Sequence, residues 1–159
     1  MATDSERLLT ALLDAEVEFV VIGGVAALSY GALTPTQDLD VAIPMTEENI
    51  GRLLHALRPL HPYHAMRRDL GEVSQSAHEL ARFRLMLLQT DAGRLDVLGT
   101  VDPIGPFERL KWIEAELVEG RSVRVLDLDQ LIEIKAYLRR PKDKVVELEL
   151  RAIRDRRGG

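Results

Sequence analysis

The sequence predicts an α/β (α+β) fold in which a small mixed β-sheet is covered by helices on one face. Short apolar runs of strand length alternate with longer segments whose apolar residues recur at helical spacing. Residues 19–44 combine both patterns: a buried strand, a glycine pair, a short helix and a second strand follow one another there. At 159 residues, the chain is expected to form one domain spanning residues 1–159.

Composition excludes several classes of site. The chain has no cysteine, which rules out disulfides, thiolate metal sites and cysteine nucleophiles. No apolar run reaches the roughly 18 residues of a membrane span, and the first residues lack a signal-peptide pattern. We therefore expect a cytoplasmic protein without a membrane partner.

The formal net charge of −5 argues against wholesale nucleic-acid binding, but the charge is unevenly spread. From residue 139 onward, eight basic residues outnumber four acidic ones. Two interpretations stay open for this segment: a solvated charged helix, or a patch that faces phosphate groups.

Helices are expected near the N-terminus and after the second strand. Residues 5–15 carry leucines at helical spacing, and Asp4 is a plausible cap. A longer helix is expected to start after Thr46, with two glutamates in its first turn, and to stop before Pro59. Residues 59–79 are polar and irregular, which predicts a mobile loop.

The middle of the chain predicts a hairpin followed by a helix. Residues 83–87 and 95–98 read as strands joined by a turn at residues 90–93. Residues 106–116 place Phe107, Leu110 and Ile113 at helical spacing, so a helix is expected there. Short strands are expected on either side of a turn at residues 119–121.

Two helices are expected to end the chain. Asp127, with Gln130 three residues later, resembles a capping box. Pro141 fits the first turn of the last helix. That helix is expected to bury the stripe formed by Val145, Leu148 and Ala152, with Val146 beside it.

Asp38 and Asp40 are the first candidate functional residues. Successive strand side chains point to opposite faces, so positions i and i+2 share a face about 6.6 Å apart. The two carboxylates therefore point one way, while Leu39 and Val41 point into a core. Two like charges side by side repel, and a cation between them would remove the repulsion. Paired carboxylate oxygens suit Mg²⁺.

Asp96 is the third candidate. It lies between Leu95 and Val97, so it faces away from whatever those two side chains bury. If its strand lies beside the strand of Asp38 and Asp40, the three acids form a cluster on one face of the sheet.

The pattern around these acids resembles that of the polymerase-beta-like nucleotidyltransferases, whose signature is a hydrophobic strand, Gly-Gly or Gly-Ser, a short helix and Asp-x-Asp. It resembles most the small bacterial members, which include toxins of abortive-infection and toxin–antitoxin systems. The matching residues are Ile22, Gly23, Gly24, Val25, Ala26, Gly31, Thr36, Asp38 and Asp40, with Leu131, Ile132, Lys135 and the run from 140 to 143 near the C-terminus.

The resemblance implies a reaction. Asp38 and Asp40 would hold Mg²⁺ bound to a nucleoside triphosphate, and Asp96 would complete a second metal site or accept the attacking hydroxyl's proton. A nucleoside monophosphate would pass to a hydroxyl of an RNA, a protein or a small molecule, and pyrophosphate would leave. The implied nucleotide-binding residues are Gly23, Gly24, Thr36, Lys135 and Lys142.

Two departures from the family pattern favour an alternative. Thr34 stands where relatives often carry an arginine, and Val146 stands where they often carry an acid. The chain could therefore be a catalytically inactive member that binds a co-encoded partner protein in a toxin–antitoxin-like pair. A metal-dependent phosphohydrolase is a third hypothesis, which would release inorganic phosphate instead of pyrophosphate.

Individual residues also have simpler interpretations. The glycine pair could form an ordinary strand-to-helix turn, and Lys135 could extend past Ile132 to solvent. His61 and His64 lack further ligands for a zinc site.

Overall fold

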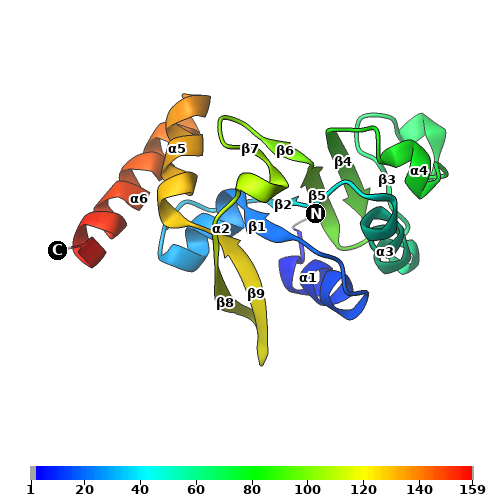
Figure 1. Cartoon of the computed structure of the whole chain (residues 1–159), viewed down its shortest axis with the longest axis horizontal. Helices are drawn as coiled ribbons and strands as arrows, with labels where there is room; N and C mark the ends of the chain where they lie inside the picture. Colours follow the sequence, from blue (N-terminus) through cyan, green and yellow to red (C-terminus); the bar gives the residue numbers. More distant parts are fainter. Residues whose placement is uncertain (1–2, 159) are drawn as a thin grey trace.

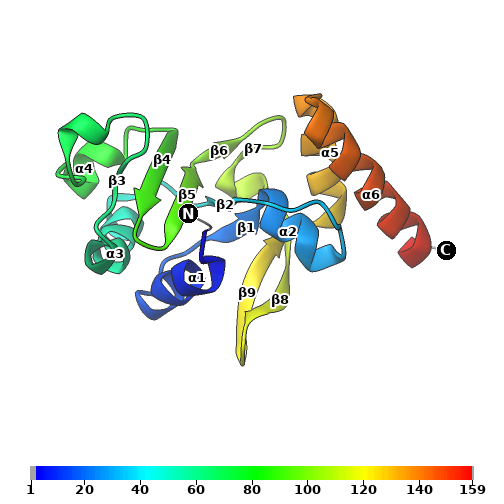
Figure 2. The same ribbon diagram turned by 180° about the vertical axis from the view of Figure 1, so that it is seen from behind.

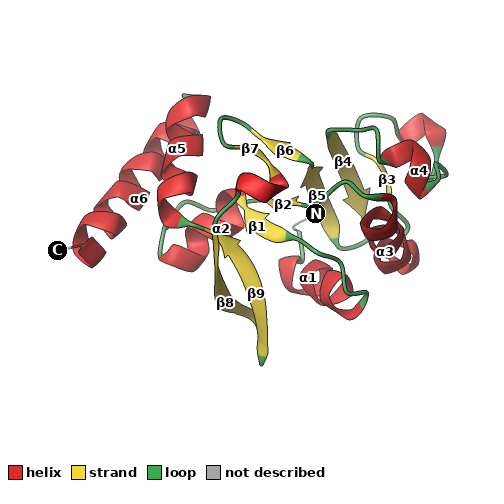
Figure 3. Ribbon diagram, viewed as in Figure 1, coloured by secondary structure: helices red, strands yellow, loops and turns green. Residues whose placement is uncertain are grey.

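A seven-stranded mixed sheet forms the centre of the computed structural model, which describes residues 3–158 (Figures 1 and 3). The strand order is β3-β4-β5-β2-β1-β9-β8, and β6 and β7 form a separate hairpin. The strands are β1 (Val20–Ile22), β2 (Asp38–Ala42), β3 (Tyr63–His64), β4 (Leu85–Thr90), β5 (Gly93–Leu98), β6 (Thr100–Val101), β7 (Gly105–Pro106), β8 (Trp112–Val118) and β9 (Arg121–Leu126).

The helices lie at both ends of the sheet and on one of its faces. The pair α5–α6 is at one end of the molecule and the pair α3–α4 at the other, and α6 runs along α5 to the C-terminus (Figure 2). The helices are α1 (Ser5–Asp14), α2 (Gly23–Tyr30), α3 (Glu47–Leu57), α4 (Ala77–Leu80), α5 (Leu128–Leu138) and α6 (Pro141–Gly158).

Both parallel and antiparallel pairs occur in the sheet, which confirms the predicted mixed fold class. Strand β2 is antiparallel to β1 and parallel to β5, and β1 is also parallel to β9. The predicted hairpin is present, with β4 antiparallel to β5. The central position of β2 brings residues from 20 to 98 into one sheet.

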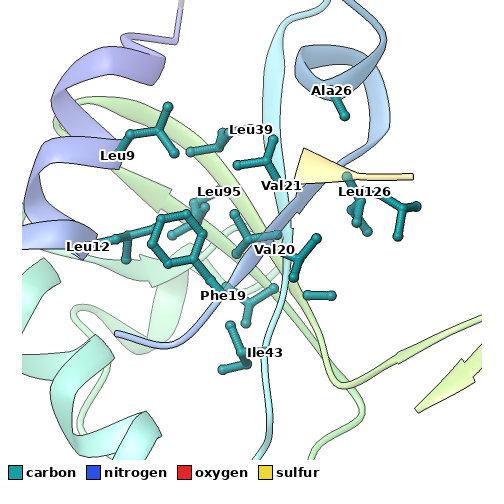
Figure 4. Packing of buried hydrophobic residues seen from close by; sticks show 14 of the residues in the cluster. Leu9, Leu12, Phe19, Val20, Val21, Ala26, Leu39, Ile43, Leu95 and Leu126 are labelled. Carbon is teal, nitrogen blue, oxygen red and sulfur yellow. The ribbon is translucent and has the colours of Figure 1, made fainter. Parts of the chain in front are cut away.

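The core lies on one face of β2 and β5. Leu39 and Leu95 are fully buried there, and Leu9 and Leu12 of α1 point toward them (Figure 4). Helix α3 packs beside α1 and buries Leu53. The period-two alternation of β2 and β5 therefore sends the apolar residues under these helices and leaves the opposite face for polar side chains.

Helix starts agree with the caps expected from the sequence. The side chain of Asp4 accepts a hydrogen bond from Arg7 N. The side chain of Thr46 accepts one from Asn49 N at 3.2 Å. Asp127 accepts from Gln130 N at 3.2 Å, but the box is only half formed. The Gln130 side chain instead accepts a hydrogen bond from Lys111 N at 2.8 Å.

The helix predicted for residues 106–116 was wrong. This segment contains the end of β7, a 3₁₀ turn (Phe107–Arg109) and most of β8. The spacing of Phe107 and Leu110 reflects the single turn, whereas Ile113 pairs with Val125 of β9. Short strands were expected on either side of the turn at Gly120, but the hairpin pairing extends back to Trp112 and overrides the helical spacing there.

The face of α6 was also predicted wrongly. Val145 and Leu148 are exposed, as is Ala152, whereas Val146, Leu150 and Ile153 are buried. Val146, Leu150 and Ile153 also recur at helical spacing, and the fully buried Asp143 lies on the same face of the helix. Helix α6 packs against α5 and α2 through the face that carries this carboxylate, because its partner Lys135 lies on α5.

Residues 59–79, expected as an irregular loop, contain short regular pieces. Two 3₁₀ turns (Arg58–Leu60 and Arg68–Leu70), β3 and α4 occur there, and α4 starts with a capping box between Ser76 and Glu79. Between residues 3 and 158, none of the helices is both long and apolar enough to cross a membrane.

Candidate active site

Three carboxylates meet on the face of the sheet opposite α1. In the parallel register of β2 and β5, Asp40 lies directly opposite Asp96, and Asp38 lies opposite Arg94. Registered partners on neighbouring strands point to the same face. The structure therefore brings Asp38, Asp40 and Asp96 to one face, from two strands far apart in the sequence.

The glycine pair lets the start of α2 approach these acids closely. Gly23 has a φ of +68°, and a Cβ there would clash with the carboxylate of Asp40. A Cβ on Gly24 would lie 2.5 Å from the hydroxyl oxygen of Thr36. No side chain caps α2, so the amide groups of its first turn remain potential donors to an anion. The pair is more than a tight turn: each glycine makes room for a predicted site residue.

Gly23→Ala tests this packing. Backbone strain at the left-handed φ is expected to lower the free energy of unfolding by about 1–3 kcal/mol, and the new methyl group displaces Asp40. Gly51→Ala is the matched control, since Gly51 lies within α3 and nothing would contact its Cβ within 4 Å. That control is expected to gain about 0.5–1 kcal/mol. Urea denaturation measures both, and equal effects would contradict the packing argument.

The electrostatics of the acids are those of a crowded, partly desolvated cluster. Burial raises the pKa of Asp40 to about 7, and the charges of Asp96 and Asp38 act in the same direction. Lys135 and Arg94 oppose the rise. Burial also raises the pKa of Asp96. The hydrogen bond that Arg94 Nε donates to Asp96 Oδ1 at 2.6 Å opposes this rise without cancelling it. A bound cation would relieve this repulsion.

Behind the acids lies a buried ionic network. Asp143 is 0% exposed and accepts from Lys135 Nζ at 3.2 Å and from Arg140 Nε at 2.5 Å. Burial alone would raise the pKa of Asp143, but these two hydrogen bonds hold it below its ordinary value. The Lys135 side chain is only 12% exposed. It therefore does not reach past Ile132 to solvent: it donates to Asp143, and its charge lowers the pKa of Asp40.

Two adjacent clefts open around the acids, and Asp40, Lys135 and Arg140 line both. The first, called the polar cleft, has a volume of about 350 Å³. It is lined by Gly24, Ala27, Thr34, Pro35, Thr36, Gln37, Asp38, Asp40, Lys135, Arg140, Lys142, Asp143 and Val146. The second, called the apolar cleft, has a volume of about 570 Å³. It is lined by Ile22, Gly23, Asp40, Arg84, Leu85, Leu87, Asp96, Leu98, Thr100, Val101, Asp102, Ile134, Lys135, Tyr137, Leu138 and Arg140.

All the site residues predicted from the sequence line one of these two clefts. Gly24, Thr36, Asp38 and Lys142 line the polar cleft alone, and Gly23 and Asp96 line the apolar cleft alone. The structure adds Arg94, Arg140 and Asp143. Arg94 could have been found by the same alternation that links the first two acids, because it lies two residues before Asp96.

Thr34 and Val146, where the sequence departs from the pattern it resembles, both line the polar cleft. The Thr34 hydroxyl donates to Glu149 Oε1 at 2.5 Å, and Leu33 N donates to the other carboxylate oxygen at 2.8 Å. These bonds lower the pKa of Glu149. Helix α6 thus holds the loop before β2 through Glu149, one turn beyond Val146.

The carboxylates have the chemistry for Mg²⁺ when a phosphate completes the ligand set. In the part of the chain that the structure describes, no three Asp, Glu, His or Cys side chains are placed to hold a metal ion alone. Asp96 in particular is engaged by Arg94. Magnesium, however, is commonly held by one or two carboxylates together with phosphate groups of the substrate. Asp38 and Asp40 could supply those carboxylates.

The two histidines weighed as zinc ligands have separate partners. His61 Nδ1 lies 2.7 Å from Asp91 Oδ2, and His64 Nε2 lies 3.1 Å from Gln75 Oε1.

Comparison with solved structures identifies the fold as nucleotidyltransferase-like. No protein-family profile and no curated protein matches the sequence. The lincosamide antibiotic adenylyltransferase LnuA, solved with lincomycin bound, has a TM-score of 0.61 and 16% identity, over 96% of this chain and 98% of that chain.

The antibiotic-resistance factor ANT(2'')-Ia has the same fold. Its solution structure has a TM-score of 0.56 and 18% identity, over 97% of this chain and 91% of that chain. Its crystal structure in complex with adenylyl-2''-tobramycin has a TM-score of 0.55 and 18% identity, over 94% of each chain.

Proposed function

We propose that the protein is a Mg²⁺-dependent nucleotidyltransferase that moves a nucleoside monophosphate from a nucleoside triphosphate to a hydroxyl of a small molecule and releases pyrophosphate. The observation that carries the proposal is the register of β2 against β5, which puts Asp40 opposite Asp96 on the face that Asp38 shares. Fold similarity to antibiotic adenylyltransferases supports it.

Asp38 and Asp40 are the residues proposed to hold the metal. When bound, Mg²⁺ would neutralise charge on the phosphates and polarise the phosphorus under attack. The like-charged pair fits this role, because a cation removes the repulsion that burial intensifies at Asp40.

The polar cleft is proposed to hold the triphosphate. Gly24 and Thr36 line it beside the uncapped start of α2, where amide groups can donate to phosphate oxygens. Lys135 and Lys142 supply positive charge, and Asp143 fixes Lys135 in place. This assignment agrees with the phosphate-facing interpretation of the basic C-terminal segment.

Asp96 is proposed to take the proton in the reaction. The acceptor hydroxyl oxygen attacks the α-phosphorus, so that a new P–O bond forms and the bond to the bridging oxygen of the β-phosphate breaks. The hydroxyl proton passes to Asp96, and the electron pair of the broken bond leaves with pyrophosphate. A raised carboxyl pKa suits a proton acceptor, because it strengthens the base.

A small-molecule acceptor is favoured over RNA or protein. LnuA was solved with lincomycin bound and ANT(2'')-Ia with adenylyl-2''-tobramycin, and both align over nearly their whole length with this chain. We therefore favour a small molecule as the acceptor.

Product analysis tests the proposal. The protein is incubated with Mg²⁺, each of ATP, GTP, CTP and UTP, and a small-molecule extract. We expect pyrophosphate and a nucleotidylated product with at least one triphosphate. Release of inorganic phosphate without a nucleotidylated product would instead identify a phosphohydrolase.

A catalytically inactive, partner-binding protein is the second candidate. Val146 favours it, because this apolar residue lines the polar cleft where relatives often place an acid. That candidate predicts a stable complex with a co-encoded protein, of the toxin–antitoxin kind. The complex should survive the double change Asp38→Ala and Asp40→Ala, whereas a transferase activity would be lost in that variant.

A further inference from the structure

The apolar cleft exposes large side chains that a ligand could cover. Leu85 at the start of β4 is 48% exposed, and Tyr137 and Leu138 at the end of α5 are 55% and 40% exposed. All three line the cleft, on walls that come from the sheet and from α5. Exposed apolar side chains gathered in a hollow beside polar groups are typical of small-molecule sites.

The charges of the apolar cleft balance. The acidic residues that line it are equal in number to the basic ones. Several of these residues already form ion pairs: Asp96 with Arg94, and Lys135 and Arg140 with Asp143. Among residues 3–158, Asp102 is the acid of this cleft that neither joins an ion pair nor belongs to the carboxylate cluster. The cleft therefore lacks the excess of negative charge that would attract a polycation. Its acids are Asp40, Asp96 and Asp102, and its bases are Arg84, Lys135 and Arg140.

Asp96 connects this cleft to the proposed reaction. It lines the apolar cleft and is absent from the lining of the polar cleft, where Gly24 and Thr36 lie. A molecule in the apolar cleft can therefore present a hydroxyl to the proposed proton acceptor. The volume of about 570 Å³ falls within the range of small-molecule sites.

We propose that the apolar cleft holds an amphipathic small molecule that bears at most one positive charge. Its hydroxyl faces Asp96, and its apolar side lies on Leu85, Tyr137 and Leu138. The role of this molecule as the nucleotidyl acceptor rests on the proposed function, whereas its binding does not.

Calorimetric titration of the full chain with two probes tests the proposal. Lincomycin combines sugar hydroxyls, an apolar chain and one basic amine, whereas tobramycin is a polyamine. We expect lincomycin to bind at least about tenfold more tightly than tobramycin. Leu138→Asp is expected to weaken lincomycin binding at least about tenfold, because it puts a charge against the apolar side of the ligand.

Two further variants make the test specific. Leu85→Gln changes the wall of the cleft that the sheet forms and is also expected to weaken lincomycin binding. It provides the test if Leu138→Asp fails to fold. Leu148→Asp is the matched control: Leu148 is 69% exposed on α6 and does not line the cleft, so binding should be unchanged.

Three results would overturn the inference: tighter binding of tobramycin, binding of neither probe, or loss of Mg²⁺·ATP binding in Leu138→Asp with lincomycin binding intact. The last would assign the cleft to the nucleotide. Lincomycin binding that depends on Leu138, but without pyrophosphate release from any triphosphate, would uphold the inference and overturn the proposed function.

Discussion

With metal removed by EDTA at pH 8, Asp40→Asn is expected to be more stable than the wild-type protein and inactive in nucleotidyl transfer. Burial raises the pKa of this carboxyl from 3.8 to about 7, so ionising it in the folded protein is unfavourable. The difference corresponds to up to about 4 kcal/mol, which an amide does not incur. The same change removes a proposed metal ligand.

The pH dependence gives this prediction its sign. Because the folded-state pKa is raised, the stabilising contribution of the protonated Asp40 is fully present below pH 3.8 and is lost as pH rises through about 7. Asp40→Asn should therefore match the wild-type protein near pH 4 and exceed it increasingly toward pH 8. Urea denaturation at several pH values measures the difference.

Asp129→Asn is the control for this experiment. Its carboxylate is 73% exposed and faces Arg154 at 3.6 Å, so its removal should change stability by less than about 0.5 kcal/mol at any of these pH values. A wild-type protein that is as stable as Asp40→Asn at pH 8 would show that burial and the neighbouring acids do not raise the pKa of Asp40.

Asp143→Ala is expected to destabilise the protein by about 3–5 kcal/mol. The substitution leaves the ammonium group of Lys135, 12% exposed, without the carboxylate that compensates its burial. It also frees Arg140, which Asp143 holds at 2.5 Å. Because both cations line the clefts, binding of a nucleoside triphosphate should weaken as well.

Glu48→Ala separates this effect from the ordinary loss of an ion pair. Glu48 pairs with Arg52 at 2.7 Å on α3, but both side chains are largely solvated. Its removal should cost less than about 1 kcal/mol. A similarly small loss in Asp143→Ala, measured by the urea midpoint at constant slope, would contradict a structural role for the buried network.

The face shared by the acids could be predicted because strand alternation is local. Asp38 and Asp40 are two residues apart, and Asp96 stands between two apolar residues that face the core. Their convergence required the parallel pairing of β2 with β5, which no local pattern specifies. The pairing was therefore only a condition of the predicted cluster, and the resemblance to a family implied a shared role for the three acids without it.

The errors arose where pairing or packing with another element overrides the apolar spacing of a segment. The spacing of Phe107, Leu110 and Ile113 indicated a helix up to residue 116, but residues 112–118 form a strand because they pair with β9. On α6, apolar periodicity selected Val145 and Leu148, but the face that packs is the one on which Asp143 forms a buried ion pair with Lys135. Val146, Leu150 and Ile153 form a second apolar stripe at helical spacing, and the buried Asp143 in the first turn shares that face, which a search for apolar residues alone does not register.

The central claim is that Asp38 and Asp40 hold Mg²⁺ together with a nucleoside triphosphate at the start of α2. Calorimetric titration with Mg²⁺ and the α,β-methylene analogue of each triphosphate, which cannot transfer its nucleotide, measures this directly. The account predicts one binding site for at least one analogue, lost with EDTA and lost in both Asp38→Asn and Asp40→Asn. Unchanged binding in these variants, or no binding of any analogue to the wild-type protein, would contradict it.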